Sequence, residues 1–266
     1  MTDKTATQVT ERAMLVVADN PGVMTLDGTN TWILREPGAR KSVVVDPGPL
    51  DEQHLQAVLA AAGDVGLILI THRHFDHTEG IARLAHLSGA STRAIDPQYC
   101  VDADVLVDGE QIVVDGLTID VLATPGHTAD SACFRLVDEN TLLSGDTILG
   151  RGTSVVAHPD GALDPYLDSL ALVGELAEEG LVERILPGHG PVITDPGAVV
   201  IGYLDHRAER LDQVLQAVEN GATTPREVVE LVYQDVDQLL WPAAELSVAA
   251  QLEYLHEADP PAPQDL

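Results

Sequence analysis

Lysine is nearly absent from this chain of 266 residues. Only Lys4 and Lys41 occur, and 43 acidic against 14 basic residues give a formal net charge of −29. Non-specific binding to nucleic acid or to anionic membranes depends on clustered Lys and Arg side chains, so this balance disfavours both kinds of partner. Aromatic residues make up only 3% of the chain, which also weakens any surface for stacking bases. A local basic groove remains compatible with this composition.

Cysteine and long hydrophobic runs are also scarce. Cys100 and Cys133 have neither the spacing of a metal site nor that of a disulfide framework, so we expect both to be small, buried apolar residues. No apolar run approaches the length of a membrane span, and charged residues stand where a signal peptide would need an apolar core. We therefore expect a cytoplasmic protein without a membrane partner. Hydrophobic residues still make up 45% of the chain, enough to bury a full core.

Short apolar runs are grouped along the chain, with a few helical segments between them. Alternating or β-branched patterns predict strands at residues 14–18, 31–34, 42–45, 65–70, 111–114, 117–122, 131–137, 141–144 and 184–186. Asp115 and Gly116 predict a tight hairpin between two of these strands. Helical periodicity is typical of residues 51–62, 81–87 and about 167–179. We therefore expect an α+β protein with two mostly antiparallel sheets and helices outside them.

From about residue 198 onwards the pattern is helical. Apolar residues recur every three or four positions along residues 200–218, which predicts one long helix that ends at Asn220 and Gly221. Thr224 and Pro225 predict the start of a second helix, and residues 243–256 are typical of a third. We therefore divide the chain into residues 1–197 and a helical C-terminal appendage, residues 198–266, which is small for independent folding.

One segment, residues 71–77 with the sequence THRHFDH, concentrates residues that can bind metals. Its four candidate ligands are His72, His74, Asp76 and His77. The segment follows a strand that we expect to be buried and precedes a helix, so it forms a loop at the end of a rigid element, a common place for a functional site. Neutral imidazole and carboxylate are ligands of zinc-like ions. A polar loop without function would account for one histidine, but not for this cluster.

Three further candidate ligands lie in loops that follow predicted strands. His127 lies in TPGHT, Asp146 in SGD and His189 in LPGHG, each with Gly or Pro beside it. Any one of them alone would more often be a turn residue than a ligand. Their common placement indicates that they complete the site begun by residues 72–77, or form a second one.

These motifs, in this order, resemble those of the metallo-β-lactamase superfamily over roughly residues 12–195. Matches at residues 28–31, 145–150 and 187–191, and His206, Arg207 and Arg210 on the long C-terminal helix, are similar to the group named after β-lactamase-like protein 2. The resemblance implies an αββα sandwich followed by a small winged-helix-like appendage. It also implies that the C-terminal helices cap the cleft and that His206 reaches into it as a catalytic, substrate-contacting residue.

The resemblance further implies two divalent metals, most often zinc. The first would be held by His72, His74 and His127, the second by Asp76, His77 and His189, with Asp146 bridging them. Two such cations about 3.5–4 Å apart stabilise the attacking and leaving oxygens and lower the pKa of a shared water, so that the nucleophile is a bridging hydroxide. Asp76 would orient this hydroxide and accept a proton.

The ligand set alone leaves several functions open. We expect a metal-dependent hydrolase acting on a small ester or thioester. The alternatives are a single-stranded RNA endoribonuclease of the β-lactamase-like protein 2 type, a glyoxalase II-like thioester hydrolase, and a redox or non-catalytic metal protein. The acidity disfavours RNA, although four arginines could lie near the cleft: Arg73, Arg151, Arg207 and Arg210. The segment 155–161 is longer than the resemblance predicts. We interpret His158 in this segment as a surface residue.

Overall fold

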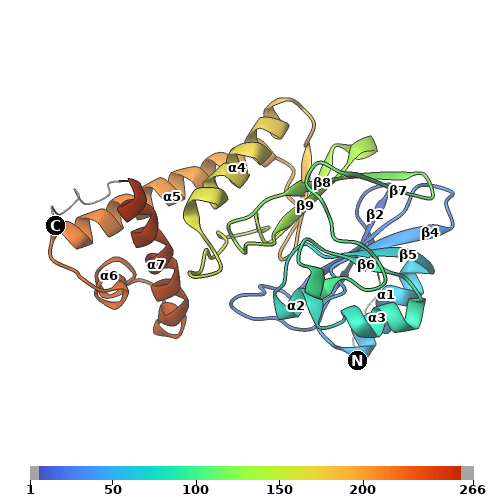
Figure 1. Ribbon diagram of the computed structural model, residues 1–266, viewed down its shortest axis with the longest axis horizontal. Coiled ribbons are helices and arrows are strands. Elements are labelled where there is room, and N and C mark those ends of the chain that lie inside the picture. Colours follow the sequence, from blue (N-terminus) through green and yellow to red (C-terminus); the bar gives the residue numbers. More distant parts are fainter. Residues whose placement is uncertain (1–5, 259–266) are drawn as a thin grey trace, which may run out of the picture.

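Two β-sheets packed face to face form the centre of the computed structural model, which describes residues 6–258 (Figure 1). The core between them consists of apolar residues from both sheets, including Trp32, Leu69, Ile119 and Phe134. Helices cover the outer faces of both sheets. The αββα sandwich that the motifs imply is therefore confirmed.

The first sheet has six strands in the order of the chain. They are β1 Thr7–Gln8, β2 Ala13–Val17, β3 Asn30–Leu34, β4 Lys41–Val45, β5 Asp64–Leu69 and β6 Thr92–Arg93. The pairs β4–β5 and β5–β6 are parallel, and the others are antiparallel. Parallel neighbours need a crossover, which α1 (Glu52–Ala62) and α3 (Ile81–Ser88) provide; both cover the outer face of this sheet.

The second sheet has five strands in the order β11-β10-β9-β8-β7. They are β7 Gln111–Val114, β8 Leu117–Ala123, β9 Ala132–Leu136, β10 Thr141–Gly145 and β11 Arg184–Pro187. Only β10 and β11 pair in parallel, and α4 (Leu163–Glu178) makes that crossover. The hairpin between β7 and β8 is confirmed: Asp115 and Gly116 have φ angles of 49° and 96°, as a tight turn with two left-handed residues requires.

Three helices follow the sandwich: α5 Pro196–Glu219, α6 Pro225–Val232 and α7 Trp241–Ala258. Asp195 caps the first, and Thr224 with Glu227 forms a capping box on the second. The start of α5 packs on α4, whereas its end packs on α6 and α7, at one end of the molecule (Figure 1). Since α5 belongs to both cores, the division at residues 197 and 198 stays a proposal.

The short elements depart most from the sequence expectations. The strands β1 and β6, with two residues each, carry no periodic pattern that a sequence could reveal. Helix α4 begins at Leu163, not near residue 167, because Asp164 and Pro165 fit a first helical turn. Single turns complete the fold: α2 Phe75–Thr78, η1 Pro97–Tyr99, η2 Val137–Glu139 and η3 Gln238–Leu240. Between residues 6 and 258, no helix combines the length and the apolar character that crossing a bilayer requires.

Candidate metal centre

The site lies where the ends of several strands of both sheets meet. The loop after β5 is joined to the start of β9 by the hydrogen bond from the Ala132 amide to the Thr71 carbonyl, 2.8 Å long. The end of β11 is joined to the start of β3 by the bond from the Asn30 amide to the Gly188 carbonyl, also 2.8 Å long. These links bring together loops that lie far apart in the chain.

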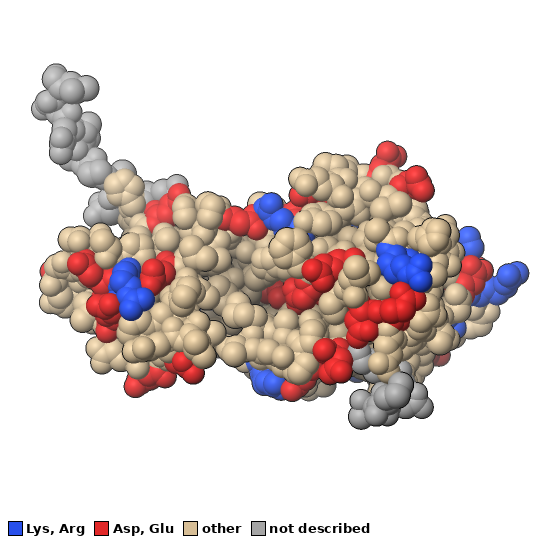
Figure 2. Space-filling view, turned by 90° about the horizontal axis from the view of Figure 1, so that it is seen from below, with Lys and Arg blue, Asp and Glu red and all other residues tan. Residues whose placement is uncertain are grey.

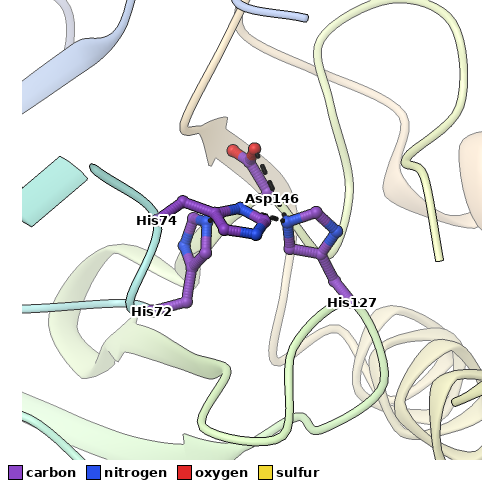
Figure 3. A group of neighbouring side chains, drawn as sticks. All are labelled: His72, His74, His127 and Asp146. Carbon is purple, nitrogen blue, oxygen red and sulfur yellow. Dashed lines mark hydrogen bonds and ion pairs between the residues drawn. The ribbon is translucent and has the colours of Figure 1, made fainter. Parts of the chain in front are cut away.

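The first group of side chains consists of His72, His74, His127 and Asp146. One ligand atom of each lies within 4.8 Å of those of the other three (Figure 3). Nδ1 of His74 lies 3.0 Å from Nε2 of His72 and 3.1 Å from Nε2 of His127. Three imidazole nitrogens from two loops therefore point to one place, with the Asp146 carboxylate beside them.

The second group consists of Asp76, His77 and His189, whose ligand atoms also lie within 4.8 Å of one another. Nε2 of His189 is 3.2 Å from Nε2 of His77 and 3.1 Å from Oδ2 of Asp76. Asp146 adjoins both groups, since its carboxylate oxygens lie 3.3 Å from Nε2 of His189, 3.5 Å from Nε2 of His77 and 3.9 Å from Nε2 of His127. The structure thus brings together all seven residues that the sequence singles out as metal ligands.

The outer ring nitrogens of four of these histidines are held by protein oxygens. The contacts are Nδ1 of His72 to Oγ1 of Thr71 at 3.0 Å, Nδ1 of His77 to Oδ2 of Asp46 at 2.8 Å, Nδ1 of His127 to the Val155 carbonyl at 2.7 Å, and Nδ1 of His189 to the Gly28 carbonyl at 3.2 Å. An oxygen acceptor at Nδ1 fixes the proton there and leaves the lone pair of Nε2 pointing inwards, the usual arrangement of histidine metal ligands. His74 differs, because its inward atom is Nδ1. The donor set of nitrogen and carboxylate oxygen fits zinc-like ions.

Burial determines the pKa of His72 and His74 in the first group, whereas neighbouring charges determine the pKa of His77 and His189 in the second. Burial lowers the pKa of His72 well below its usual range and that of His74 to about 4, so both imidazoles are neutral. Burial would raise the pKa of Asp146, but His77 and His189 lower it to about 2. Burial would also lower the pKa of His77 and His189, but the carboxylates, Asp146 foremost, raise it to about 9 and about 10. The second group thus attracts positive charge, which a divalent cation would supply in place of protons.

Asp46 is a buried residue of the site that sequence reasoning misses. Its carboxylate accepts hydrogen bonds from the Thr71 amide at 2.8 Å, from Oγ1 of Thr71 at 2.7 Å and from Nδ1 of His77 at 2.8 Å. It follows strand β4 in the sequence Asp46-Pro47-Gly48, the same strand-end pattern as the other loops, and this was the available signal. Asp46 therefore orients His77, and through Thr71 it also supports His72.

One cavity lies against the candidate centre, and a second, larger one adjoins it. The smaller one, of about 180 Å³, is lined by His127, Asp146 and Arg151 among others. The larger one, of about 300 Å³, is lined by His206, Arg207 and Arg210 among others, on the side of the C-terminal helices. The two share five lining residues: Val23, Met24, Thr153, Ser154 and Val155.

The remaining candidate residues lie outside the two groups of ligands. His206 lies in the wall of the larger cavity and is not among the clustered side chains. Arg73, which lies between two ligands in the sequence, forms ion pairs with Asp130 and Asp160. The side chain of His158 is 41% exposed and lies 3.1 Å from Glu253, a surface position.

Comparison with known proteins agrees with this geometry. Residues 24–189 match the family model of the metallo-β-lactamase superfamily, and residues 224–259 match that of the β-lactamase associated winged helix domain. The β-lactamase-like protein 2 homolog of Drosophila melanogaster is 32% identical over 273 residues, covering 94% of this chain and 90% of the relative. The atrochrysone carboxyl ACP thioesterase of Aspergillus chevalieri is 33% identical over 245 residues, covering 87% of this chain and 76% of the relative. A solved metallo-β-lactamase family protein from Thermus thermophilus has a TM-score of 0.77 at 23% identity, covering 94% of both chains.

These matches confirm the resemblance that the motifs indicate. The superfamily model spans more than half of the chain and includes all seven clustered residues, the last of them His189. The winged-helix match falls on the helical appendage. The chain is a metal-dependent hydrolase and belongs to the metallo-β-lactamase superfamily.

Proposed function

We propose that this chain hydrolyses a small ester or thioester with the help of two divalent metals, with zinc as the first candidate. One observation carries the proposal: the seven ligand atoms form two adjoining groups with the Asp146 carboxylate between them. A single ion would need only three or four of these side chains. Two groups that share one carboxylate support a dinuclear centre.

Each residue has a defined place in the proposed centre. His72, His74 and His127 would hold the first metal, His77, His189 and Asp76 the second, and Asp146 would touch both. When bound, such a pair supplies an activated water at neutral pH and stabilises charge on the oxygens of the reaction. The chain's own contribution is to fix the ligands through buried hydrogen bonds, which removes the cost of ordering them during the reaction.

Asp76 is the residue that we assign to proton transfer. Its side chain is 27% exposed, against 10% for that of Asp146, so it faces the opening more than the other carboxylate of the centre does. Its Oδ2 accepts a hydrogen bond of 3.0 Å from Oγ1 of Thr29, which is itself held by Asn20 at 2.9 Å. This chain of bonds orients the carboxylate so that it can position a water molecule and accept its proton.

The cavities support a small substrate. Their volumes of about 300 and 180 Å³ suit a small molecule, and much of the lining of the larger one is apolar. A curated relative that is named a thioesterase adds support for this class. The RNA alternative has less support: acidic side chains are scattered over the face in Figure 2 with few basic ones among them, and Arg73 and Arg151 are each paired with carboxylates. His206, in the wall of the larger cavity, is then a substrate-contacting residue.

The test combines metal analysis with kinetics. The purified protein should contain about two metal ions per chain, and zinc, iron and manganese should be measured separately. It should also hydrolyse members of a thioester and ester panel, assayed beside a labelled single-stranded RNA. His127→Ala should remove most of the first metal together with the activity. His86→Ala, which changes an exposed histidine on α3, is the matched control. Full metal content and full turnover in the His127 variant would contradict the proposal.

A further inference from the structure

Among the described residues, two arginines in the larger cavity form no ion pair with a carboxylate, whereas most other arginines do. Within residues 6–258, ion pairs to Asp or Glu are formed by Arg12, Arg40, Arg73, Arg83, Arg93, Arg135, Arg151 and Arg226. Arg207 and Arg210, one helical turn apart on α5, form none of the ion pairs found there. In a chain with 43 acidic residues, two adjacent arginines without an acidic partner need an explanation.

The contacts of Arg207 are all with neutral groups. It is only 6% exposed, donates a hydrogen bond from Nη2 to the Ser154 carbonyl, and lies with Cζ 5.0 Å from the centre of the Tyr166 ring. Its Nε is buried without a hydrogen-bond partner in the described structure. A buried guanidinium without a counter-charge is costly unless a ligand provides one.

Arg210 is placed in the same way. Its Nη1 donates to Oε1 of Gln213 at 2.8 Å and to the Val232 carbonyl at 3.2 Å, and its Cζ lies 4.5 Å from the centre of the Tyr233 ring. All three partners are neutral, so they orient the guanidinium without cancelling its charge. His206 beside it adds no fixed charge, because burial, Arg207 and Arg210 lower its pKa.

The cavity that these arginines line adjoins the smaller cavity, which reaches the candidate metal centre. Its other walls are largely apolar, with Val236, Leu240 and Ala244 from the C-terminal appendage. It shares residues 153–155 with the smaller cavity, which His127 and Asp146 line. A molecule that spans both cavities would place one end at the metals and its other end at the arginines, with an uncharged part between them.

We propose that Arg207 and Arg210 form an anion-binding subsite, and that the preferred substrate is a thioester with a phosphate or carboxylate remote from the bond that is cleaved. This inference rests on the proposed function, because it specifies the substrate class of the same site. Guanidinium groups bind phosphate and carboxylate through charged hydrogen bonds, which are stronger than neutral ones. The negative group of the substrate supplies the counter-charge that the two arginines do not receive from residues 6–258.

The test is a panel of thioesters that carry no anion, or carry an anion on the thiol side or on the acyl side. The S-acetyl thioester of N-acetylcysteamine has no anion on the thiol side. The S-acetyl thioester of pantetheine 4′-phosphate has a phosphate there, and that of glutathione has carboxylates. Succinyl-N-acetylcysteamine places a carboxylate on the acyl side. We expect at least one anionic member to have a kcat/KM about tenfold or more above that of the neutral one, the size typical of a charged hydrogen-bond partner. The preferred member shows whether the subsite binds phosphate or carboxylate, and whether this anion lies on the thiol side or the acyl side of the thioester.

Arg210→Gln is the variant to compare, because it removes one charge without opening the buried packing around Arg207. Arg210→Gln should raise KM for the anionic thioester about tenfold and leave its kcat nearly unchanged. The kcat/KM of the neutral thioester should not change. Arg210→Lys should restore part of the loss for the anionic thioester. Arg226→Gln is the matched control: Arg226 also stacks on an aromatic ring, that of Trp241 at 4.7 Å, but it is paired with Glu230 and Glu245 and does not line the cavity.

Binding without turnover separates the two proposals. Pantetheine 4′-phosphate, glutathione and inorganic phosphate should be titrated calorimetrically into the wild type and the Arg210→Gln variant. If no thioester is hydrolysed but an anion binds and Arg210→Gln weakens it about tenfold or more, the proposed function is wrong and the subsite stands. If thioesters are hydrolysed without preference for charge, or if Arg210→Gln affects neutral and anionic members equally, the subsite is wrong and the proposed function stands. Absence of both hydrolysis and anion binding would overturn both.

Discussion

Replacing Asp46 by Asn tests whether the buried support of the metal ligands controls metal affinity. Asp46 is 2% exposed and accepts three hydrogen bonds, two from Thr71 and one from His77. An Asn side chain keeps one acceptor oxygen and replaces the other by an NH₂ group. If the NH₂ takes the position of Oδ2, it faces Oγ1 of Thr71 and Nδ1 of His77; if the amide turns over, it faces the Thr71 amide. In either orientation, a donor meets a donor.

The expected loss can be worked out from these contacts. A hydrogen bond to a charged acceptor contributes about 1.5–3 kcal/mol, and a buried donor left without a partner costs about 1–3 kcal/mol. Loss of a residue that orients a metal ligand typically weakens metal affinity about 10–100-fold, which corresponds to about 1.4–2.7 kcal/mol. The two ranges agree, so we expect the second metal, proposed to bind His77, to dissociate about 10–100 times more readily. The first metal should change less, because Asp46 reaches His72 only through Thr71.

The assay is a competition titration with a chromophoric chelator, which resolves two dissociation constants if two metals bind. Thermal unfolding of the metal-free protein shows whether the fold survives. Asp120→Asn is the control, since it removes the ion pair with Arg135 on the second sheet and touches none of the seven clustered residues. The same dissociation constant for the more weakly bound metal in the Asp46→Asn protein and in the wild type would refute the reasoning. An equal loss of metal affinity in the Asp120→Asn control would also refute it.

Three further predictions concern other parts of the centre and the core. Asp76→Asn should keep the fold and, once loaded with metal, have a kcat lower by roughly 10²–10⁴, the usual contribution of a general base; near-normal rates in the metal-loaded variant would make Asp76 purely structural. Gly188→Ala should lower metal content, because its Cβ would overlap Oδ1 of Asp146 and lie 2.9 Å from Cε1 of His77. Gly202→Ala should leave the content unchanged, because among the described residues its Cβ would contact nothing within 4 Å apart from the neighbouring backbone of its own helix. Cys133 should stay unreactive towards Ellman's reagent at pH 8 until the protein is unfolded, because burial raises its pKa to about 11; a fast reaction of this thiol in the native protein would contradict its placement.

The seven clustered residues could be predicted from sequence because each lies in a segment that follows a strand. A strand with apolar residues on both faces, such as β5, has one place in a sandwich, and the loop that follows it then has a fixed position. Short Gly and Pro motifs fix the direction of that loop. Candidate ligands such as His127 and His189 can therefore be recognised from the sequence pattern alone.

The supporting contacts could not be predicted, because they depend on how distant segments pack. Nδ1 of His127 is held by the Val155 carbonyl, and a carbonyl leaves no trace in a sequence. Asp46 was open to detection from its strand-end motif, but only its burial against His77 separates it from an ordinary turn residue. The inward atom of His74 is Nδ1 rather than Nε2, a difference of side-chain rotation that residue type does not encode.

The segment from residue 153 to residue 158 connects the C-terminal helices to the proposed centre. Oγ of Ser154 lies 3.0 Å from Nδ1 of His127, and the Ser154 carbonyl accepts a hydrogen bond from Arg207 on α5. Further along, the His158 amide donates to the Leu246 carbonyl on α7 at 3.2 Å.

His127, a candidate ligand of the first group, is thus held by a loop that is itself held by two helices of the appendage. Those helices also form the wall of the larger cavity. The candidate centre and the larger cavity therefore both depend on contacts between the sandwich and the C-terminal helices. In the proposed function, the sandwich supplies the seven candidate ligands, and the helices of the appendage supply part of the cavity wall that a substrate would contact.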